Sequence, residues 1–132
     1  MITTNPMNSK TTLMILSAYN AAVGLLLFFA AAVIAKQALP LASDEVLDIA
    51  AGNNQSLGVA YLGIGILTFF IRNAVGDIAR NAQIGWGIAG SLILLNLVRG
   101  MLTYPDFHPP IGFLITGTLV IAFAFWGATK TR

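Results

Sequence analysis

The sequence predicts an all-α integral membrane protein whose four helices cross the bilayer as an up-down-up-down bundle. Two compositional observations favour this class: 57% of the residues are hydrophobic and only 9% are charged, whereas about a quarter of the residues of a soluble domain are charged. The third observation is that the charges lie almost entirely between or outside four long apolar stretches. A helix of roughly 20 apolar residues crosses a hydrocarbon core about 30 Å thick. We place the spans at about residues 13–35, 54–72, 82–103 and 111–128, within one transmembrane domain that covers residues 1–132.

The first predicted span is followed by a long connection that carries a helix of its own. The apolar core of this span is longer than the roughly 7 to 15 residues of a secretory signal, so we expect it to be retained. After it, Ser43 is a suitable N-cap for a short helix that opens with Asp44 and Glu45 and ends near Gly52. Because this helix has one apolar side, we expect it to lie along the outer membrane surface.

The remaining connections are shorter. Between the second and third spans, Asn73, Gly76 and Asp77 are typical of a helix break and a cap. Before the fourth span, Pro109 and Pro110 suit a helix start, where a missing backbone N–H costs no hydrogen bond. Short turns favour antiparallel neighbours, which is the basis for the predicted bundle order.

The charges indicate an orientation. With four crossings, both chain ends and the turn between the second and third spans share one side, which holds Lys10, Arg72, Arg80, Lys130, Arg132 and a single acid, Asp77. The other side holds Lys36, Arg99, Asp44, Glu45, Asp48 and Asp106. The positive-inside rule therefore predicts cytoplasmic termini, in what we expect to be a bacterial inner membrane.

Small residues at spacings of three and four mark the faces on which we expect the helices to pack. Lipid is as apolar as leucine, so membrane helices associate through close contact and hydrogen bonds, and this spacing is typical of crossings near +20°. Gly63, Gly87 and Gly90 lie off these faces, which indicates contacts with another subunit. The predicted packing residues are Ser17, Asn20, Gly24, Gly58, Gly65, Gly85, Ala89, Gly117 and Ala124.

Three aromatic residues lie near predicted span ends. Trp86 and Trp126 are placed at the inner boundary and Tyr104 at the outer one. Amphipathic rings favour the headgroup region, so we interpret all three as membrane anchors.

Polar residues near the outer ends of the spans form a candidate ligand cluster. Tyr61 and Asn96 lie at similar depth, roughly 10 Å below the outer surface, so we expect them to contact each other. Arg99 lies one turn closer to the outside, and a charge within hydrocarbon is costly unless it finds a partner. The cluster comprises Asn54, Gln55, Tyr61, Asn96, Arg99 and Tyr104, with Asp106 and His108 at its edge.

Two interpretations of this cluster compete. In the structural one, which we favour, Arg99 extends to the outer headgroups and the amides bridge helices, as Asn20 does nearer the cytoplasm. In the functional one, the cluster lines a vestibule for an anionic or polar head group, with Arg99 as counter-ion. The bound molecule is then a lipid or a quinone.

Several function classes are excluded or disfavoured. The sequence has no cysteine and one histidine, which excludes disulfides, thiolate metal sites and a bis-histidine haem within one chain. Asp106 and His108 are too few for a metal site. The basic residues do not gather on one face, so no nucleic-acid partner is expected. A catalytic role is disfavoured because no nucleophile with an adjacent base is recognisable.

The middle of the chain resembles a known group. Residues 56–65 (SLGVAYLGIG), followed by residues 71–74 (IRNA), are similar to the corresponding stretch of small bacterial four-span proteins of the DoxX-like group. The similarity covers about the middle half of the chain. It implies a four-helix fold, and some members of the group are linked to redox complexes. No functional residue set is carried over from the resemblance.

The sequence therefore favours a non-enzymatic membrane protein that acts by helix association, as a homo-oligomer or as an accessory subunit of a larger membrane complex. The main alternative is a binder or transporter of a lipid- or quinone-sized ligand that uses the outward-facing cluster, and a further alternative is a small membrane enzyme. No resident cofactor is evident. We expect membrane lipids and other membrane subunits as partners, and a bundle of this size is expected to enclose little cavity unless subunits combine.

Overall fold

The computed structural model describes residues 6–131, and the side chains from Ser9 onward. These residues form α1 (Pro6–Phe29), α2 (Ala31–Ala38), α3 (Asp44–Phe70), α4 (Gly76–Thr103) and α5 (Ile111–Lys130). α1, α4 and α5 are each long and apolar enough to cross a membrane. The prediction of an all-α protein is therefore confirmed, and three of its helices have the length and composition of membrane spans. α3 is also long, but its first half carries acids and a run of side-chain amides.

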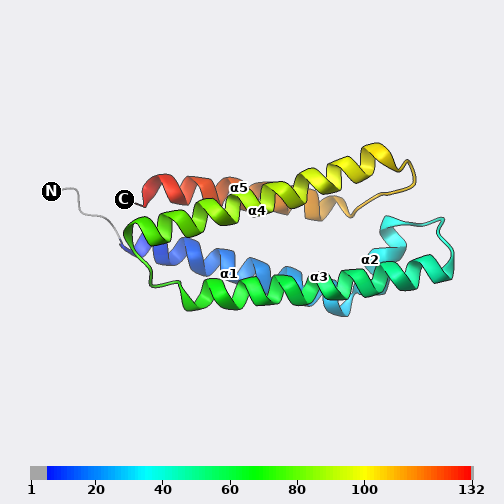
Figure 1. Ribbon diagram of the computed structural model, residues 1–132, viewed down its shortest axis with the longest axis horizontal. Helices are drawn as coiled ribbons and strands as arrows, with labels where there is room; N and C mark the ends of the chain where they lie inside the picture. The colour runs from blue at the N-terminus through cyan, green and yellow to red at the C-terminus, as the bar shows by residue number, and fades with distance from the viewer. Residues whose placement is uncertain (1–5, 132) are drawn as a thin grey trace.

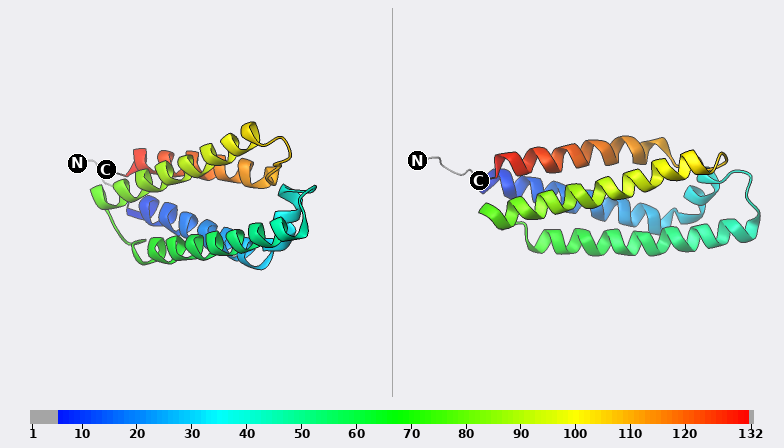
Figure 2. Two further views of the ribbon diagram at one scale, coloured as in Figure 1. Left: turned by 45° about the vertical axis from the view of Figure 1, so that its right-hand side comes forward. Right: turned by 45° about the horizontal axis from the view of Figure 1, so that its top comes forward.

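The helices form two antiparallel hairpins (Figure 1). α1 packs along α3, and α4 packs along α5. α1 begins and α5 ends at the same end of the molecule, here called the terminal end, and the loops on either side of Asp44 and Asp106 lie at the opposite loop end. The hairpins meet mainly through α1 and α5, which lie close near the terminal end and apart toward the loop end (Figure 2). Although α3 and α4 are described over their full lengths, no Cα atom of one lies within 8 Å of a Cα atom of the other.

Glycines allow α1 and α3 to approach until their backbones touch. A Cβ built on Gly24 would lie 2.8 Å from the carbonyl oxygen of Gly58, and a Cβ built on Gly58 would lie 2.7 Å from the carbonyl oxygen of Gly24. One side of this contact continues toward the terminal end, where the Ser17 hydroxyl donates a 2.8 Å hydrogen bond to the Gly65 carbonyl. We call Ser17, Gly24, Gly58 and Gly65 the glycine seam. In lipid the hydrophobic effect does not drive helices together, so close backbone packing of this kind is a main source of helix association.

α4 and α5 pack differently, with bulky side chains placed over glycines. A Cβ on Gly87 would lie 2.7 Å from the Phe125 ring, and a Cβ on Gly90 would lie 2.9 Å from Ile121. The expectation that Gly87 and Gly90 contact another subunit is therefore wrong, because α5 side chains already occupy the space over them. No described atom lies within 4 Å of a Cβ built on Gly63.

The first predicted span is divided into two helices. The break falls at Ala30, and α2 then turns toward the loop between α4 and α5 (Figure 1). α3 contacts the chain on both sides of the break. A Cβ on Gly58 would lie 2.8 Å from the backbone nitrogen of Phe28, and the Asn54 side chain donates a 3.2 Å hydrogen bond to the carbonyl of Ala31.

The short surface helix is not a separate element. A helix begins at Asp44 after Ser43, but it continues through Gly52 to Phe70. A glycine that ends a helix usually takes a positive φ, and among the described residues only Gly76 does so, at +59°. Gly76 lies at the start of α4, which begins there rather than near residue 82.

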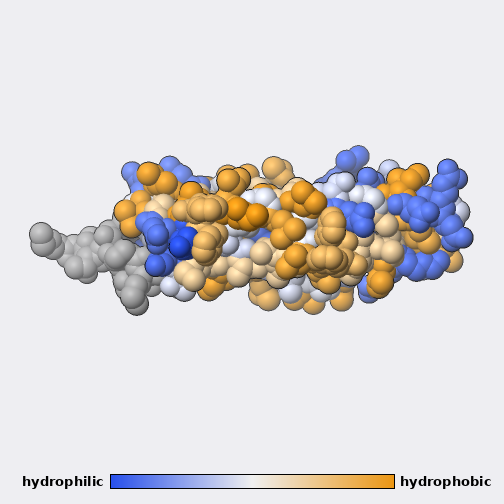
Figure 3. All heavy atoms as spheres, turned by 90° about the horizontal axis from the view of Figure 1, so that it is seen from below, coloured by the Kyte–Doolittle hydropathy of each residue, from blue (hydrophilic) through white to orange (hydrophobic). Residues whose placement is uncertain are grey.

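The surface of the molecule is banded. On the face formed by α1 and α3, hydrophobic side chains cover the middle and hydrophilic side chains gather at both ends (Figure 3). Most of the large exposed apolar residues of α3 lie in its second half, Leu57, Val59, Ile66, Leu67 and Phe70 among them, and Val46 and Ile49 are exposed in its first half.

The glycine seam makes a stability prediction. We expect Gly58→Ala to lower the stability of the folded protein by about 1 to 3 kcal/mol, because the added methyl group forces α1 and α3 apart. The measurement is the thermal unfolding midpoint in a mild detergent. Gly63→Ala is the control, since its methyl group has open space and a helical alanine is favoured over glycine by about 1 kcal/mol. Equal midpoints for the two variants would contradict the close contact.

Candidate functional site

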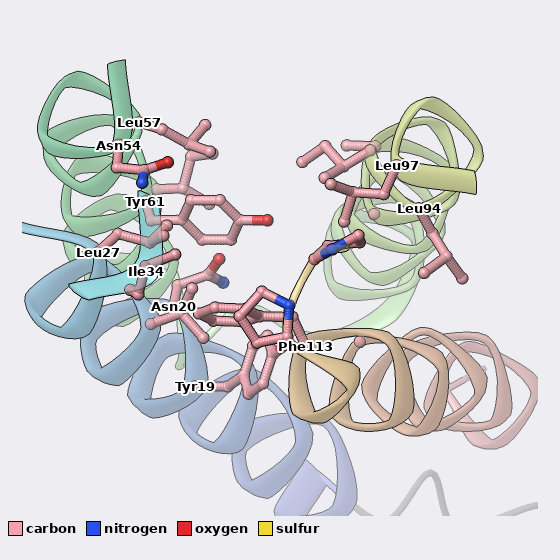
Figure 4. Close-up of a pocket in the computed structure, with 18 of the residues that line it drawn as sticks. Tyr19, Asn20, Leu27, Ile34, Asn54, Leu57, Tyr61, Leu94, Leu97 and Phe113 are labelled. Carbon is pink, nitrogen blue, oxygen red and sulfur yellow. The ribbon is translucent and has the colours of Figure 1, made fainter. Parts of the chain in front are cut away.

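A cavity of about 440 Å³ lies between the two hairpins, on the side where α3 and α4 do not meet. The expectation that a bundle of this size encloses little cavity is wrong, because the bundle is closed on three sides only. Volumes of this order are typical of small-molecule pockets. Figure 4 shows side chains of α3 and α4 facing each other across the cavity, with Tyr61 on one side and Leu94 and Leu97 on the other.

The walls of the cavity are mostly apolar. On the α1 side, the buried residues Val23, Leu27 and Ile34 form a cluster on which Tyr61 and Phe113 pack. On the α4 side, the lining includes Gly85, Ala89, Leu94 and Leu97. None of the described residues that line the cavity is charged. An uncharged, apolar lining is suited to an apolar molecule and offers nothing to compensate an ion.

The loop end of the cavity is covered. Ile34, Ala38 and Leu39 reach it from α2 and its end, and Phe107 and Pro109 reach it from the loop before α5. The two segments are joined by a hydrogen bond of 2.7 Å from the backbone N–H of His108 to the carbonyl of Ala38. The break at Ala30 therefore has a structural consequence, since it directs α2 over the end of the cavity.

Aromatic side chains form the floor of the cavity toward the terminal end. The rings of Tyr19 and Trp86 meet edge to face, with centroids 6.1 Å apart, and the Tyr19 hydroxyl lies 3.9 Å from a Cβ built on Gly117. The interpretation of Trp86 as a membrane anchor is wrong, because its ring packs on α1 between the hairpins. Trp126 and Tyr104, in contrast, are 56% and 64% exposed on the surface.

Polar side chains of α1 and α3 also reach the cavity. Asn20 is buried, and its amide nitrogen donates a 2.8 Å hydrogen bond to the Leu16 carbonyl of its own helix. The expected hydrogen bond from Asn20 to another helix is therefore wrong. The amide nitrogen of Asn54 is also used, but its hydrogen bond goes to another helix, to the carbonyl of Ala31 in α2. No hydrogen bond to either side-chain carbonyl oxygen, or to the Tyr61 hydroxyl, is found among residues 6–131. The buried indole N–H of Trp86, which also lines the cavity, has no hydrogen-bond partner in this part of the chain.

The predicted polar cluster is divided between two places. Asn54 and Tyr61 line the cavity, whereas Asn96, Arg99 and Tyr104 line a separate hollow of about 390 Å³ on α4 and the following loop. The expected contact between Tyr61 and Asn96 is wrong because α3 and α4 do not meet. Gln55, Asp106 and His108 are exposed and line neither space.

The predicted packing residues are divided as well. Ser17, Gly24, Gly58 and Gly65 lie in the glycine seam, and Ala124 is fully buried. Gly85, Ala89 and Gly117 instead line the cavity. Gly85 has no described atom within 4 Å of its added Cβ, so its small size leaves open space rather than a helix contact.

A buried polar group at the terminal end was missed by the sequence analysis. Gln83 is fully buried, and its amide nitrogen lies 3.4 Å from the Thr131 hydroxyl. The same hydroxyl lies 3.1 Å from the Ser9 hydroxyl, so one cluster joins α1, α4 and the end of α5. The sequence signal that could have identified it is a glutamine within a predicted apolar span, three residues before Trp86, since a polar side chain there needs a hydrogen-bond partner.

The chemistry that this site offers is hydrogen bonding and apolar contact. The polar residues of the lining are tyrosines, asparagines and a tryptophan. Among the residues described, the lining contains no acidic or basic residue, no histidine, and no serine or threonine. No group of three or more metal-ligating side chains is found in the described residues.

Gln83 provides a prediction about how the hairpins are held together. We expect Gln83→Ala to lower stability by about 1 to 3 kcal/mol, because the variant loses a buried side chain and its hydrogen bonds. Gln55→Ala removes an exposed glutamine and is the matched control. Chemical or thermal unfolding in detergent measures both, and a loss for Gln55→Ala as large as that for Gln83→Ala would rule out a special role for the buried cluster.

Comparisons with known proteins give no relative from which a role can be transferred. No family model, no curated protein and no solved structure matches the chain. The resemblance to the DoxX-like group therefore stays a prediction.

Proposed function

We propose that all four long helices cross the membrane, with both chain ends in the cytoplasm of a bacterial inner membrane. α3 is the helix in question, since its first half is polar. Its second half exposes large apolar side chains such as Leu67 and Phe70, and the glycine seam aligns it with α1, which is long and apolar enough to span. Cytoplasmic termini follow from the excess of basic residues at the terminal end.

Within this arrangement, we propose that the protein is a non-enzymatic binder of a lipid-like molecule. The observation that carries the proposal is the cavity, which combines a volume of about 440 Å³ with an apolar, uncharged lining. In the proposed orientation it lies within the bilayer. A molecule that partitions into membranes would have access to a cavity at this depth, and its apolar surface would match the apolar lining.

The route into the cavity runs from the membrane. α2 and the loop before α5 cover the loop end, and the Gln83 cluster closes the terminal end. The entrance that we propose lies between α3 and α4, which line the cavity from opposite sides and have no Cα atoms within 8 Å of each other. A lipid tail can enter through this side without crossing water, so the binding does not require the chain to unfold or the hairpins to part.

Helix association is the second candidate function. The same open side favours it, because α3 has no helix partner where a four-helix bundle would place α4. A helix of a second copy or of another membrane subunit would pack there. This candidate differs from ligand binding in what copurifies with the chain.

Native mass spectrometry from a mild detergent tests the two candidates together. We expect the wild-type protein to retain lipid-like molecules, and we expect Gly85→Leu to lose them severalfold, because its side chain occupies the open space over Gly85 in the cavity. Gly63→Leu is the matched control, since Gly63 also has open space but does not line the cavity.

The outcomes separate the candidates. Equal retention in Gly85→Leu and the wild type would contradict binding in this cavity. A protein–protein complex that Gly85→Leu disrupts, without retained lipid in the wild type, would support association instead. A bare wild-type monomer would contradict both.

A further inference from the structure

We propose that the ligand is an uncharged amphiphile with a hydroxyl head group, and that this head is held by Tyr61 and Asn20 in the interior of the bundle. This inference rests on the proposed binding function and specifies the chemical class of the ligand. It goes beyond the apolar character of the walls, because it is carried by the hydrogen-bonding groups that the cavity leaves unused.

The first step is the position of the two residues. Tyr61 packs on the apolar cluster of α1 and α2, and its hydroxyl points from α3 into the space between the hairpins (Figure 4). The Cβ of Asn20 lies 3.3 Å from a Cβ built on Gly65, which is one helical turn from Tyr61 on the same helix face. Both side chains line the same cavity.

The second step is the hydrogen-bonding capacity that remains. The Asn20 amide nitrogen is used by the Leu16 carbonyl, so the side-chain carbonyl oxygen is left as an acceptor. The Tyr61 hydroxyl can donate as well as accept. No hydrogen bond to it is found in the described part of the chain, where its electrostatic neighbour is Tyr19 on the same cavity wall. A hydroxyl head group satisfies both, because it donates to Asn20 and accepts from Tyr61.

The third step is the exclusion of other heads. A carboxylate or phosphate would have no cation in the lining, and its negative charge would face the Asn20 carbonyl oxygen, which is unfavourable in a site of low dielectric. An ammonium head would likewise lack a carboxylate. A ketone or ester can accept from Tyr61 and from the indole N–H of Trp86, which is buried without a partner, but it leaves the Asn20 acceptor unpaired, at the cost of a buried polar group.

The test uses Trp86, which lies at the cavity floor. Trp126→Phe leaves Trp86 as the sole tryptophan of the two in the chain, and bromine atoms on a lipid tail quench its fluorescence only at short range. Three probes share one dibrominated stearyl tail and differ in the head: the alcohol, the methyl ester of the acid, and the acid itself at an alkaline pH that keeps it ionised. All are titrated into the protein in nanodiscs of fixed lipid composition.

We expect the alcohol to quench at the lowest concentration, the ester at a higher one, and the carboxylate at the highest. Tyr61→Phe should weaken the apparent binding of the alcohol by about two- to tenfold, the range for one lost hydrogen bond. Asn20→Leu should remove the preference for the alcohol over the ester, because the alcohol loses its acceptor and the ester no longer leaves a buried acceptor unpaired. Tyr104→Phe, which removes an exposed hydroxyl outside the cavity, is the matched control.

Each result has a distinct meaning. If Gly85→Leu abolishes quenching by all three probes but the wild type does not prefer the alcohol, the head-group assignment is overturned and the cavity remains a ligand site. If Gly85→Leu leaves quenching by all three probes unchanged, the binding function itself fails. If Tyr61→Phe and Tyr104→Phe affect the alcohol equally, the Tyr61 hydroxyl does not hold the head.

Discussion

The close backbone contact between α1 and α3 determines the rest of the structure. At Gly24 and Gly58 each helix leaves no room for a side chain on the other, so α3 is held against α1 along the seam. In lipid, where burial of apolar surface gives no drive, this kind of contact is the principal means of fixing one helix on another. α3 packs on α1 and does not reach α4, and the cavity lies between these two helices.

The two hairpins use their small residues in opposite ways. In the α1–α3 hairpin, glycines bring two backbones together. In the α4–α5 hairpin, the side chains of Phe125 and Ile121 lie over Gly87 and Gly90. These side chains separate the two helix backbones. The difference leaves a second row of small residues on α4, at Gly85 and Ala89, facing the cavity instead of a helix. Their lack of side chains adds to the cavity volume.

These details explain which features could be predicted from the sequence. Composition and charge placement are sufficient to predict an all-α protein with helices apolar enough to span a membrane. Local rules locate the helix starts after Ser43 and at Ile111, although the Ser43 side chain makes no capping hydrogen bond. Spacing alone identified two small-residue rows on α4 and favoured the wrong one for helix packing, because the choice depends on the bulky residues of α5. The contact of Tyr61 with Asn96 was wrong for a related reason. Equal depth in the membrane does not bring two helices together, and no sequence rule states that one side of a four-helix bundle stays open.

The central claim is that α3 and α4 stay apart in the membrane, and cysteine cross-linking tests it most directly because the natural chain has no cysteine. A disulfide needs Cα atoms within about 7 Å, whereas those of α3 and α4 are more than 8 Å apart throughout. In native membranes under a mild oxidant, we expect Gly90→Cys with Ile121→Cys to cross-link readily, since these positions lie in direct contact. Tyr61→Cys with Leu97→Cys, across the cavity, should stay reduced. Rapid cross-linking of the second pair, at the rate of the first, would show that the bundle closes and would contradict the cavity on which the proposed function depends.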